Sequence, residues 1–256
     1  MKKLLTIALT VLVSGSTYAQ LKPVSYTDGP QKLSGFSIAP AKGNQKKAGI
    51  LILPAWKGID KHSKLVAEDL SKLGYYAFVA DIYGEGNYPT DNKSAGEKAG
   101  YYKKNVKEYQ QRINLALQQL IKSGADASRI VVIGYCFGGT GVLEAARADF
   151  PVRGVVSFHG GLGRDSARTI NPVKAKVLVL HGADDPSVPP AQVAAFQQDM
   201  REAKADWQMI YYANAVHAFT EPEAGNDNSK GAAYNELADK RSWKHFLLFL
   251  DEVLAN

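Results

Sequence analysis

Apolar and polar positions fall into short blocks along the chain, and each block predicts a strand or a helix. Two alternating runs, Val24 to Asp28 and Leu33 to Ile38, predict strands joined by a Gly-Pro turn. Ala48 to Leu53 is a continuous apolar run that ends at Pro54, which is typical of a strand buried on both faces. Apolar residues then recur with a helical period as far as Gly74, where a helix is expected to end.

The rest of the chain continues this alternation of strand and helix. The pattern predicts strands over 75–80, 129–133, 154–158, 176–180 and 207–212, a loop over 84–100, and helices over about 101–122, from near 136, over 190–204 and over about 234–254. Such regular alternation predicts an α/β fold with a mainly parallel sheet and helices on both faces. No repeat, linker or second domain interrupts residues 20–256, which we expect to form one domain.

The first nineteen residues have the composition of a secretory signal peptide. Lys2 and Lys3 give it a positive start, Leu4 to Val13 is an apolar stretch of ten residues, and the small residues that follow end at Ala19. A bilayer span needs about 20 apolar residues, so this segment is too short for stable membrane insertion. We therefore expect cleavage before Gln20 and an exported protein, either periplasmic or secreted.

Composition excludes other classes of protein. Of the 256 residues, 45% are hydrophobic and 10% aromatic, which is too many for a disordered or low-complexity chain. The net charge is +6, but two of the positive charges lie in the expected signal peptide and the other lysines are scattered. A surplus this small is typical of a solvated surface, so no nucleic-acid partner is expected.

Candidate chemistry centres on the turn Gly134-Tyr135-Cys136-Phe137-Gly138-Gly139. A nucleophile with a glycine two residues before and after it, between an apolar strand and a helix, forms the nucleophile elbow of α/β-hydrolases, here with Cys in place of Ser. The glycines are needed because the backbone segments on either side approach too closely for a Cβ. The helix N-terminus favours a thiolate and can hold an oxyanion. Taken alone, this turn fits a buried structural cysteine as well as it fits a nucleophile. Cys136 is the chain's only cysteine.

An acid and a base follow in the order that α/β-hydrolases use. The strand over 176–180 leads into a turn that places Asp184 and Asp185 at the carboxyl edge of the sheet, and the next strand leads into a loop with His217. Singly, an Asp in a turn is usually a cap and a loop His is usually a surface residue. Nucleophile, acid and base in this order, each after a predicted strand, favour a triad. The spacing itself leaves both Asp184 and Asp185 open.

These motifs resemble the dienelactone hydrolase family over nearly the whole chain beyond residue 20. The resemblance rests on the cysteine elbow and on the segments 81–84, 156–160, 182–189, 217–219 and 233–243. It implies an α/β-hydrolase fold and a triad of Cys136, Asp185 and His217, since the family's acid is the last residue of the G-x-x-D motif. The implied activity is hydrolysis of small carboxylic esters or lactones, of the carboxymethylenebutenolidase type, through an acyl thioester.

Two backbone N–H groups are expected to form the oxyanion hole. One is that of Phe137, the residue after the nucleophile. The other, implied by the resemblance, is that of Trp56. In this scheme His217 takes the thiol proton and Asp185 fixes the tautomer of its ring.

We expect no cofactor and no metal, because the five histidines lack metal-ligand spacing. The expected partner is a small-molecule ester or lactone. The sequence leaves the oligomeric state undefined.

The chain departs from the characterised dienelactone hydrolases at the Glu that helps to hold and release their Cys and at the arginines that bind a substrate carboxylate. Their Glu before the oxyanion residue is Ala55 here, and their Arg four residues beyond the histidine is Glu221. No arginine precedes Arg112, so an upstream carboxylate-binding arginine is also missing. We therefore expect neutral substrates to be preferred. The alternatives are a redox-sensing or non-catalytic thiol protein and a binding module on the same scaffold, neither of which needs an oriented base.

Two other motifs fit either a structural or a functional role. Asp81 and Tyr83 follow a strand, and they fit either the mouth of a pocket or a turn. His159 and the glycines after it look like an oxyanion loop. They follow the nucleophile instead of preceding it, which favours an ordinary connecting loop.

Overall fold

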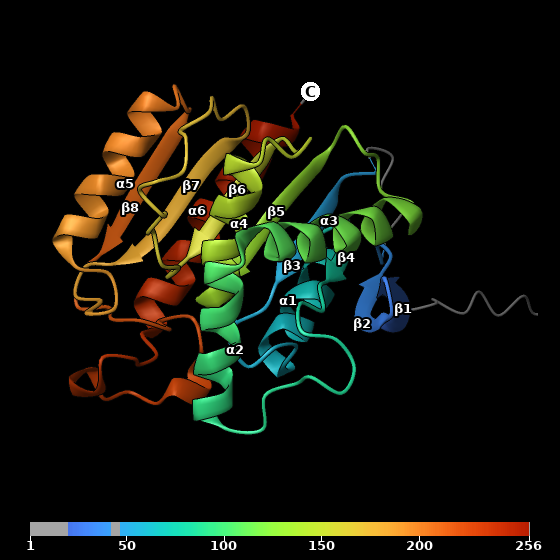
Figure 1. Cartoon of the computed structure of the whole chain (residues 1–256), viewed down its shortest axis with the longest axis horizontal. Coiled ribbons are helices and arrows are strands. Elements are labelled where there is room, and N and C mark those ends of the chain that lie inside the picture. Colours follow the sequence, from blue (N-terminus) through green and yellow to red (C-terminus); the bar gives the residue numbers. More distant parts are fainter. Residues whose placement is uncertain (1–19, 42–46, 256) are drawn as a thin grey trace, which may run out of the picture.

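The computed structural model describes residues 20–41 and 47–255, and the expected signal peptide, residues 1–19, lies outside them. One eight-stranded sheet, in the order β1-β2-β4-β3-β5-β6-β7-β8, forms the centre of the described chain (Figure 1). From β4 to β8 all neighbouring strands are parallel, whereas β1 and β2 form a hairpin that pairs antiparallel with β4. The expected α/β-hydrolase fold, with its mainly parallel sheet, is confirmed.

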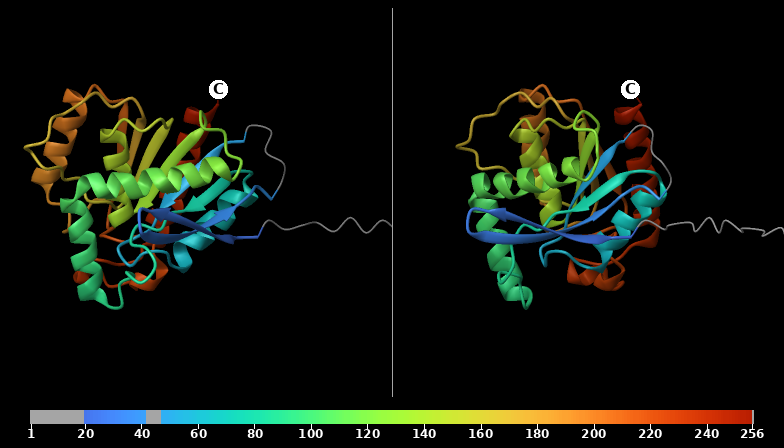
Figure 2. Two further views of the ribbon diagram at one scale, coloured as in Figure 1. Left: turned by 45° about the vertical axis from the view of Figure 1, so that its right-hand side comes forward. Right: turned by 90° about the vertical axis from the view of Figure 1, so that its right-hand side faces the viewer.

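The strands and helices have the following bounds. The strands are β1 (Lys22–Asp28), β2 (Gln31–Ile38), β3 (Gly49–Leu53), β4 (Tyr76–Val79), β5 (Ile130–Tyr135), β6 (Gly154–Phe158), β7 (Lys176–Gly182) and β8 (Trp207–Tyr212). The helices are α1 (Lys61–Lys72), α2 (Asn92–Lys104), α3 (Val106–Lys122), α4 (Phe137–Arg147), α5 (Pro190–Glu202) and α6 (Glu236–Leu254), with two short 3₁₀ turns at Pro222–Ala224 and Asn228–Lys230. Figure 2 shows the β1–β2 hairpin, in blue, as a long ribbon at one edge of the molecule.

The sheet separates two hydrophobic cores because side chains alternate along each buried strand. On β3, Leu51 and Leu53 pack with α3, α4 and α5, whereas Ile50 and Ile52 pack with α1 and α6. Figure 1 shows α3 and α4 in front of the sheet and α6 behind it. Because both faces are covered, β3, β5 and β6 are buried over their whole length, as the continuous apolar runs predict.

The prediction of a loop over 84–100 followed by a single helix over 101–122 is wrong, because this part of the chain forms two helices. A separate helix, α2, begins at Asn92, and the chain breaks at Asn105 (φ −96°, ψ 60°) before α3 starts. Asp91 caps α2, since its side chain accepts from the Ser94 N–H at 2.7 Å and Ser94 Oγ accepts from the Asp91 N–H at 3.1 Å. The two glycines of α2 and its narrow apolar face, with only Ala95, Ala99 and Tyr102 buried, hide the helix from a periodicity argument.

Within the described ranges, no helix combines the length and the apolar character that a membrane crossing requires.

Candidate active site

Cys136 lies at the sharp turn between the end of β5 and the start of α4. Its backbone has φ 52° and ψ −110°, a strained conformation for a residue with a side chain. The two flanking glycines are required. A Cβ on Gly134 would lie 2.2 Å from the Gly138 carbonyl oxygen, and a Cβ on Gly138 would lie 2.1 Å from the Leu53 carbonyl oxygen. The turn is thus tight enough to present Cys136 outward at the carboxyl edge of the sheet.

Three of the predicted side chains form one continuous hydrogen-bonded series. Cys136 Sγ lies 2.9 Å from His217 Nε2, and His217 Nδ1 lies 2.8 Å from Asp185 Oδ2. The other oxygen of Asp185 accepts from the Ser187 N–H at 2.8 Å, which fixes the carboxylate. The neighbouring Asp184 is exposed, and only its backbone N–H is bound, to the Ala215 carbonyl. The structure therefore separates two acids that spacing alone leaves equivalent.

The hydrogen bonds of this series shift the pKa values of His217 and Asp185. Burial lowers the pKa of His217, but the hydrogen bonds to Asp185 and Cys136 outweigh burial and raise it to about 10. Burial also favours the neutral form of Asp185, yet the hydrogen bond from His217 keeps the pKa of Asp185 below its usual value. These hydrogen bonds therefore favour a protonated His217 imidazole beside an ionised Asp185 at neutral pH.

The two expected oxyanion residues are held beside Cys136 by aromatic neighbours. The Tyr83 hydroxyl donates to the Trp56 carbonyl at 2.7 Å, and the Tyr83 ring is stacked on Phe137 with centroids 5.8 Å apart. On the other side of Phe137, the Tyr109 ring stacks at 4.6 Å and its hydroxyl donates to the Phe137 carbonyl at 3.0 Å. The N–H groups of Phe137 and Trp56 donate to no other described residue, so both are available to an acceptor.

Sequence reasoning left the roles of Asp81, Tyr83 and His159 open. Asp81 holds a turn: its carboxylate accepts from the N–H groups of Tyr83 and Gly84 at 3.1 and 2.9 Å. Tyr83 supports the Trp56 loop, a role that no local pattern reveals because the two residues come from different strand ends. His159 is fully buried, and its ring lies edge-on to His217 with centroids 5.4 Å apart. It therefore packs against the candidate base.

The carboxylate of Glu221 is the unusual charge beside this site. Its Oε1 is buried and has no hydrogen-bond partner among the described residues. Burial, followed by the neighbouring charge of Asp60, raises the pKa of Glu221 to about 7 against the opposing effects of His217 and Lys57. Ala55, in the loop before Trp56, is buried and adds no charge. The surroundings of His217 thus contain an acid where a carboxylate-binding site needs a cation.

Chemically, the arrangement provides a thiol nucleophile, an oriented base and free N–H donors at the carboxyl edge of the sheet. Over residues 20–41 and 47–255, no cluster of three or more His, Cys, Asp or Glu is placed to hold a metal ion.

Comparison with known proteins assigns the chain to a family. The sequence model of the dienelactone hydrolase family matches residues 33–254. A Bradyrhizobium protein described as "Probable 2-oxo-3-(5-oxofuran-2-ylidene)propanoate lactonase" is 26% identical over 234 residues, which cover 88% of this chain and 90% of that protein.

Solved structures resemble the chain over most of its length. A dienelactone hydrolase-like promiscuous phosphotriesterase from metagenomic libraries superposes with a TM-score of 0.85 at 34% identity, covering 92% of this chain and 99% of that one. A structure described as m3DLH superposes with a TM-score of 0.86 at 32% identity, covering 92% and 98% of the two chains.

Proposed function

Because the chain belongs to the dienelactone hydrolase family and is a hydrolase that acts on ester bonds, we propose that Cys136, His217 and Asp185 are its catalytic triad. The proposed substrates are small carboxylic esters or lactones, without metal or cofactor. The observation that carries the proposal is the unbroken hydrogen-bonded series from Cys136 Sγ to the Asp185 carboxylate. A redox sensor or a binding module has no use for a base held in this orientation.

The acylation half of the reaction follows from the charge state of the series. The Cys136 thiolate attacks the ester carbonyl, a C–S bond forms, and the carbonyl electron pair moves to oxygen. The N–H groups of Phe137 and Trp56 stabilise that oxyanion. When the oxyanion collapses, the C–O bond to the alcohol breaks and the His217 imidazolium gives its proton to the leaving oxygen. An acyl thioester on Cys136 and a neutral His217 remain.

The second half returns the enzyme to its starting state. Neutral His217 takes a proton from water, the hydroxide attacks the thioester carbonyl, and the same two N–H groups hold the new oxyanion. Collapse then releases the carboxylic acid and the Cys136 thiolate, beside a His217 that is protonated again. Asp185 stabilises the imidazolium in both halves and keeps Nδ1 as a donor.

Neutral substrates fit this pocket better than carboxylated ones. A substrate carboxylate beside Glu221 meets a carboxyl group that is partly ionised at neutral pH and no arginine, and the loss of a charge-assisted hydrogen bond costs about 1.5 to 3 kcal/mol, roughly ten- to a hundredfold in kcat/KM. We therefore expect a neutral ester to be hydrolysed faster than the matched ester with a free carboxylate. Glu221→Arg should narrow or reverse that difference. A tenfold preference of the wild type for the carboxylated partner would contradict the argument.

A panel of substrates tests the proposal. Wild type and Cys136→Ala are assayed with p-nitrophenyl acetate, a small lactone and a neutral phosphotriester, the last because a similar structure is described as a promiscuous phosphotriesterase. Loss of the nucleophile should lower kcat by roughly 10³-fold or more. Hydrolysis at the wild-type rate by Cys136→Ala, with unchanged thermal unfolding, would overturn the triad. No turnover of any ester by the wild type, with ready oxidation of Cys136 by peroxide, would favour the redox alternative.

We also propose that the protein is exported. The support is the segment Lys2 to Ala19, whose charge, apolar length and small-residue end are those of a signal peptide.

A further inference from the structure

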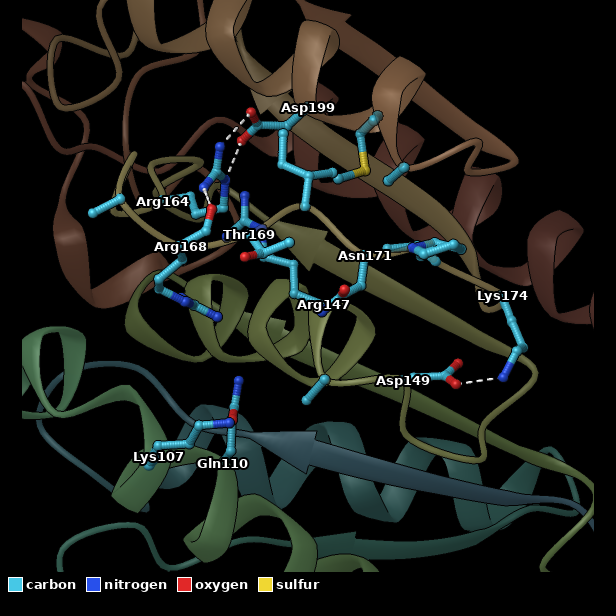
Figure 3. Close-up of a pocket in the computed structure, with 17 residues that line it drawn as sticks. Lys107, Gln110, Arg147, Asp149, Arg164, Arg168, Thr169, Asn171, Lys174 and Asp199 are labelled. Atoms are coloured by element: carbon cyan, nitrogen blue, oxygen red, sulfur yellow. Dashed lines mark hydrogen bonds and ion pairs between the residues drawn. The ribbon is translucent and has the colours of Figure 1, made fainter.

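A cavity of about 720 Å³ lies between α3, α4, α5 and the connection from β6 to β7 (Figure 3). This volume is in the range of sites for small ligands. Neither Cys136, Asp185 nor His217 lines it, so it is separate from the candidate active site.

The lining of this cavity carries an excess of positive charge. The cationic side chains on its walls are Lys107, Arg147, Arg164, Arg168 and Lys174. Asp149 and Asp199 line it as well, and Glu144 is paired with two of the arginines. Over these described residues, the cations exceed the carboxylates by two charges.

Carboxylates of the protein neutralise part of this positive charge. Arg164 forms a bidentate pair with Asp199, with Nε and Nη2 at 2.9 and 3.0 Å from the two carboxylate oxygens. Lys174 pairs with Asp149. Glu144, however, is shared: Arg147 binds one of its oxygens at 2.9 Å and Arg168 the other at 2.8 Å. One carboxylate therefore balances two guanidinium groups, of which that of Arg147 is only 6% exposed.

Three cationic side chains around the same space keep donors that no described carboxylate binds, one of them buried and two facing solvent. Arg147 Nε is buried and has no hydrogen-bond partner. The Arg168 side chain is 29% exposed and pairs with Glu144 through Nη2, and the exposed Lys107 has no ion pair with any described residue. Figure 3 shows Lys107, on α3, across the cavity from Arg168. A buried N–H without an acceptor is unfavourable unless water or a ligand supplies one.

We propose that this cavity binds a small phosphate dianion, either inorganic phosphate or the phosphate group of a small monoester, between Lys107 and Arg168. A phosphate monoester carries about 1.5 to 2 negative charges at neutral pH, which matches the excess of two cations. The planar guanidinium of Arg168 and the point charge of Lys107 are the two forms in which proteins bind phosphate oxygens. Donors from opposite walls suit a tetrahedral group better than a planar carboxylate.

Bound phosphate would join α3 to the segment that carries Arg164 and Arg168. That segment is also tied to the elbow helix α4, because Thr140 Oγ1 donates to the Gly161 carbonyl at 3.1 Å and Arg147 donates to the Leu162 carbonyl at 3.0 Å. The ligand therefore stabilises the folded state by mass action, without contact with the candidate triad.

Isothermal titration calorimetry at matched ionic strength tests the proposal. The probes are inorganic phosphate, glycerol 3-phosphate and succinate, with sodium chloride as the ionic control. We expect one phosphate per chain, bound at least about tenfold more tightly than succinate. Lys107→Gln and Arg168→Gln should each weaken binding about tenfold, the effect of one charge-assisted hydrogen bond. Lys122→Gln, a matched change at the exposed far end of α3, should leave the affinity unchanged.

The remaining outcomes overturn the proposal. Phosphate that binds no better than chloride shows that the cavity holds only water, and equal binding of succinate removes the phosphate assignment. Undiminished affinity in both Lys107→Gln and Arg168→Gln places the phosphate elsewhere. Thermal unfolding of Lys107→Gln and Arg168→Gln without phosphate, expected at the wild-type midpoint, verifies that the variants are folded and keeps the outcome independent of the proposed triad.

Discussion

Cys136 is held by backbone contacts that compensate its strained conformation. Its N–H donates to the Phe158 carbonyl at 3.0 Å and its carbonyl accepts from the Thr140 N–H at 3.2 Å, so both backbone groups are satisfied although φ is positive. A positive φ in a residue with a Cβ costs on the order of 1–3 kcal/mol and persists only where the surroundings enforce it. Here the enforced turn brings the sulfur to His217.

The reactivity of Cys136 should depend on His217. Because His217 keeps its proton up to a pKa of about 10, we expect iodoacetamide to alkylate Cys136 rapidly already between pH 6 and 7. In His217→Ala the rate should fall at neutral pH and its profile should move toward that of an ordinary thiol, near ~8.5. The measurement is the alkylation rate against pH by mass spectrometry.

His245→Ala is the matched control for this reaction. His245 lies on α6 and pairs with the Tyr212 hydroxyl at 2.8 Å, outside the candidate site, so its removal should not change the profile. A wild-type Cys136 that resists iodoacetamide in the native protein would instead support a buried structural thiol.

Glu221 should make stability depend on pH. Its pKa is raised from 4.5 to about 7, chiefly by burial, so the folded state binds the proton more tightly than the unfolded state. Stability is therefore lost as pH rises from about 4.5 to 7. Glu221→Gln lacks this loss, and above pH 7 it should be more stable than the wild type by up to about 3 kcal/mol.

Urea unfolding at pH 4.5 and pH 8 measures this effect. Glu97→Gln, at an exposed position of α2 that does not act on the Glu221 pKa, is the control and should show no pH-dependent gain. Equal stabilities of Glu221→Gln and wild type at both pH values would mean that the Glu221 carboxyl is solvated.

At the scale of single elements, the turn between β5 and α4 tolerates no side chain at its glycines. In Gly134→Ala the new Cβ would overlap backbone atoms of Gly138 and Gly139, which cannot move without displacing α4. We expect the free energy of unfolding to fall by about 2–4 kcal/mol. Esterase activity should also fall under conditions where the variant is still folded, because Cys136 is displaced. Thermal unfolding and p-nitrophenyl acetate hydrolysis measure the two effects.

Gly100→Ala is the matched control in α2. An added Cβ there meets nothing within 4 Å, and a glycine inside a helix costs about 0.5–1 kcal/mol relative to alanine, so this variant should be slightly more stable. Equal thermal stability and equal esterase activity of Gly134→Ala and Gly100→Ala would contradict the close packing of the turn between β5 and α4.

The strength of local patterns decides which elements the sequence predicts. Continuous apolar runs such as the one over β5 identify buried strands, because few other structures bury consecutive residues on both faces. Helix α2 escapes this reasoning since its glycines and polar face leave a weak period, although the capping pair Asp91 and Ser94 was a usable signal. The partnership of Tyr83 with Trp56 depends on which strands are neighbours, and no local pattern carries that.

The described chain accounts for a complete sheet with both faces covered, and β1 starts just beyond Gln20. If residues 1–19 serve only in export, a variant that begins at Gln20 should fold with the thermal midpoint and the activity of the processed protein. N-terminal sequencing of protein from the native cell envelope should give Gln20 or a residue close to it. An intact Met1 there would contradict export by cleavage.

The candidate site illustrates what the order of residues along a whole chain can predict. Cys136, Asp185 and His217 follow the parallel strands β5, β7 and β8, whose carboxyl ends share one edge of the sheet, and their order along the chain predicted their proximity. The charge of their surroundings needed the structure, since the burial of Glu221 and the cavity beside Arg168 arise from segments distant in sequence.

The most direct measurement for the central claim is rapid-quench mass spectrometry of the protein during hydrolysis of p-nitrophenyl acetate. We predict a transient acetyl group on the peptide that contains Cys136, formed as fast as the first p-nitrophenolate is released, and absent from Cys136→Ala. Release of p-nitrophenolate at the wild-type rate while Cys136 stays unmodified at every time point would contradict the account.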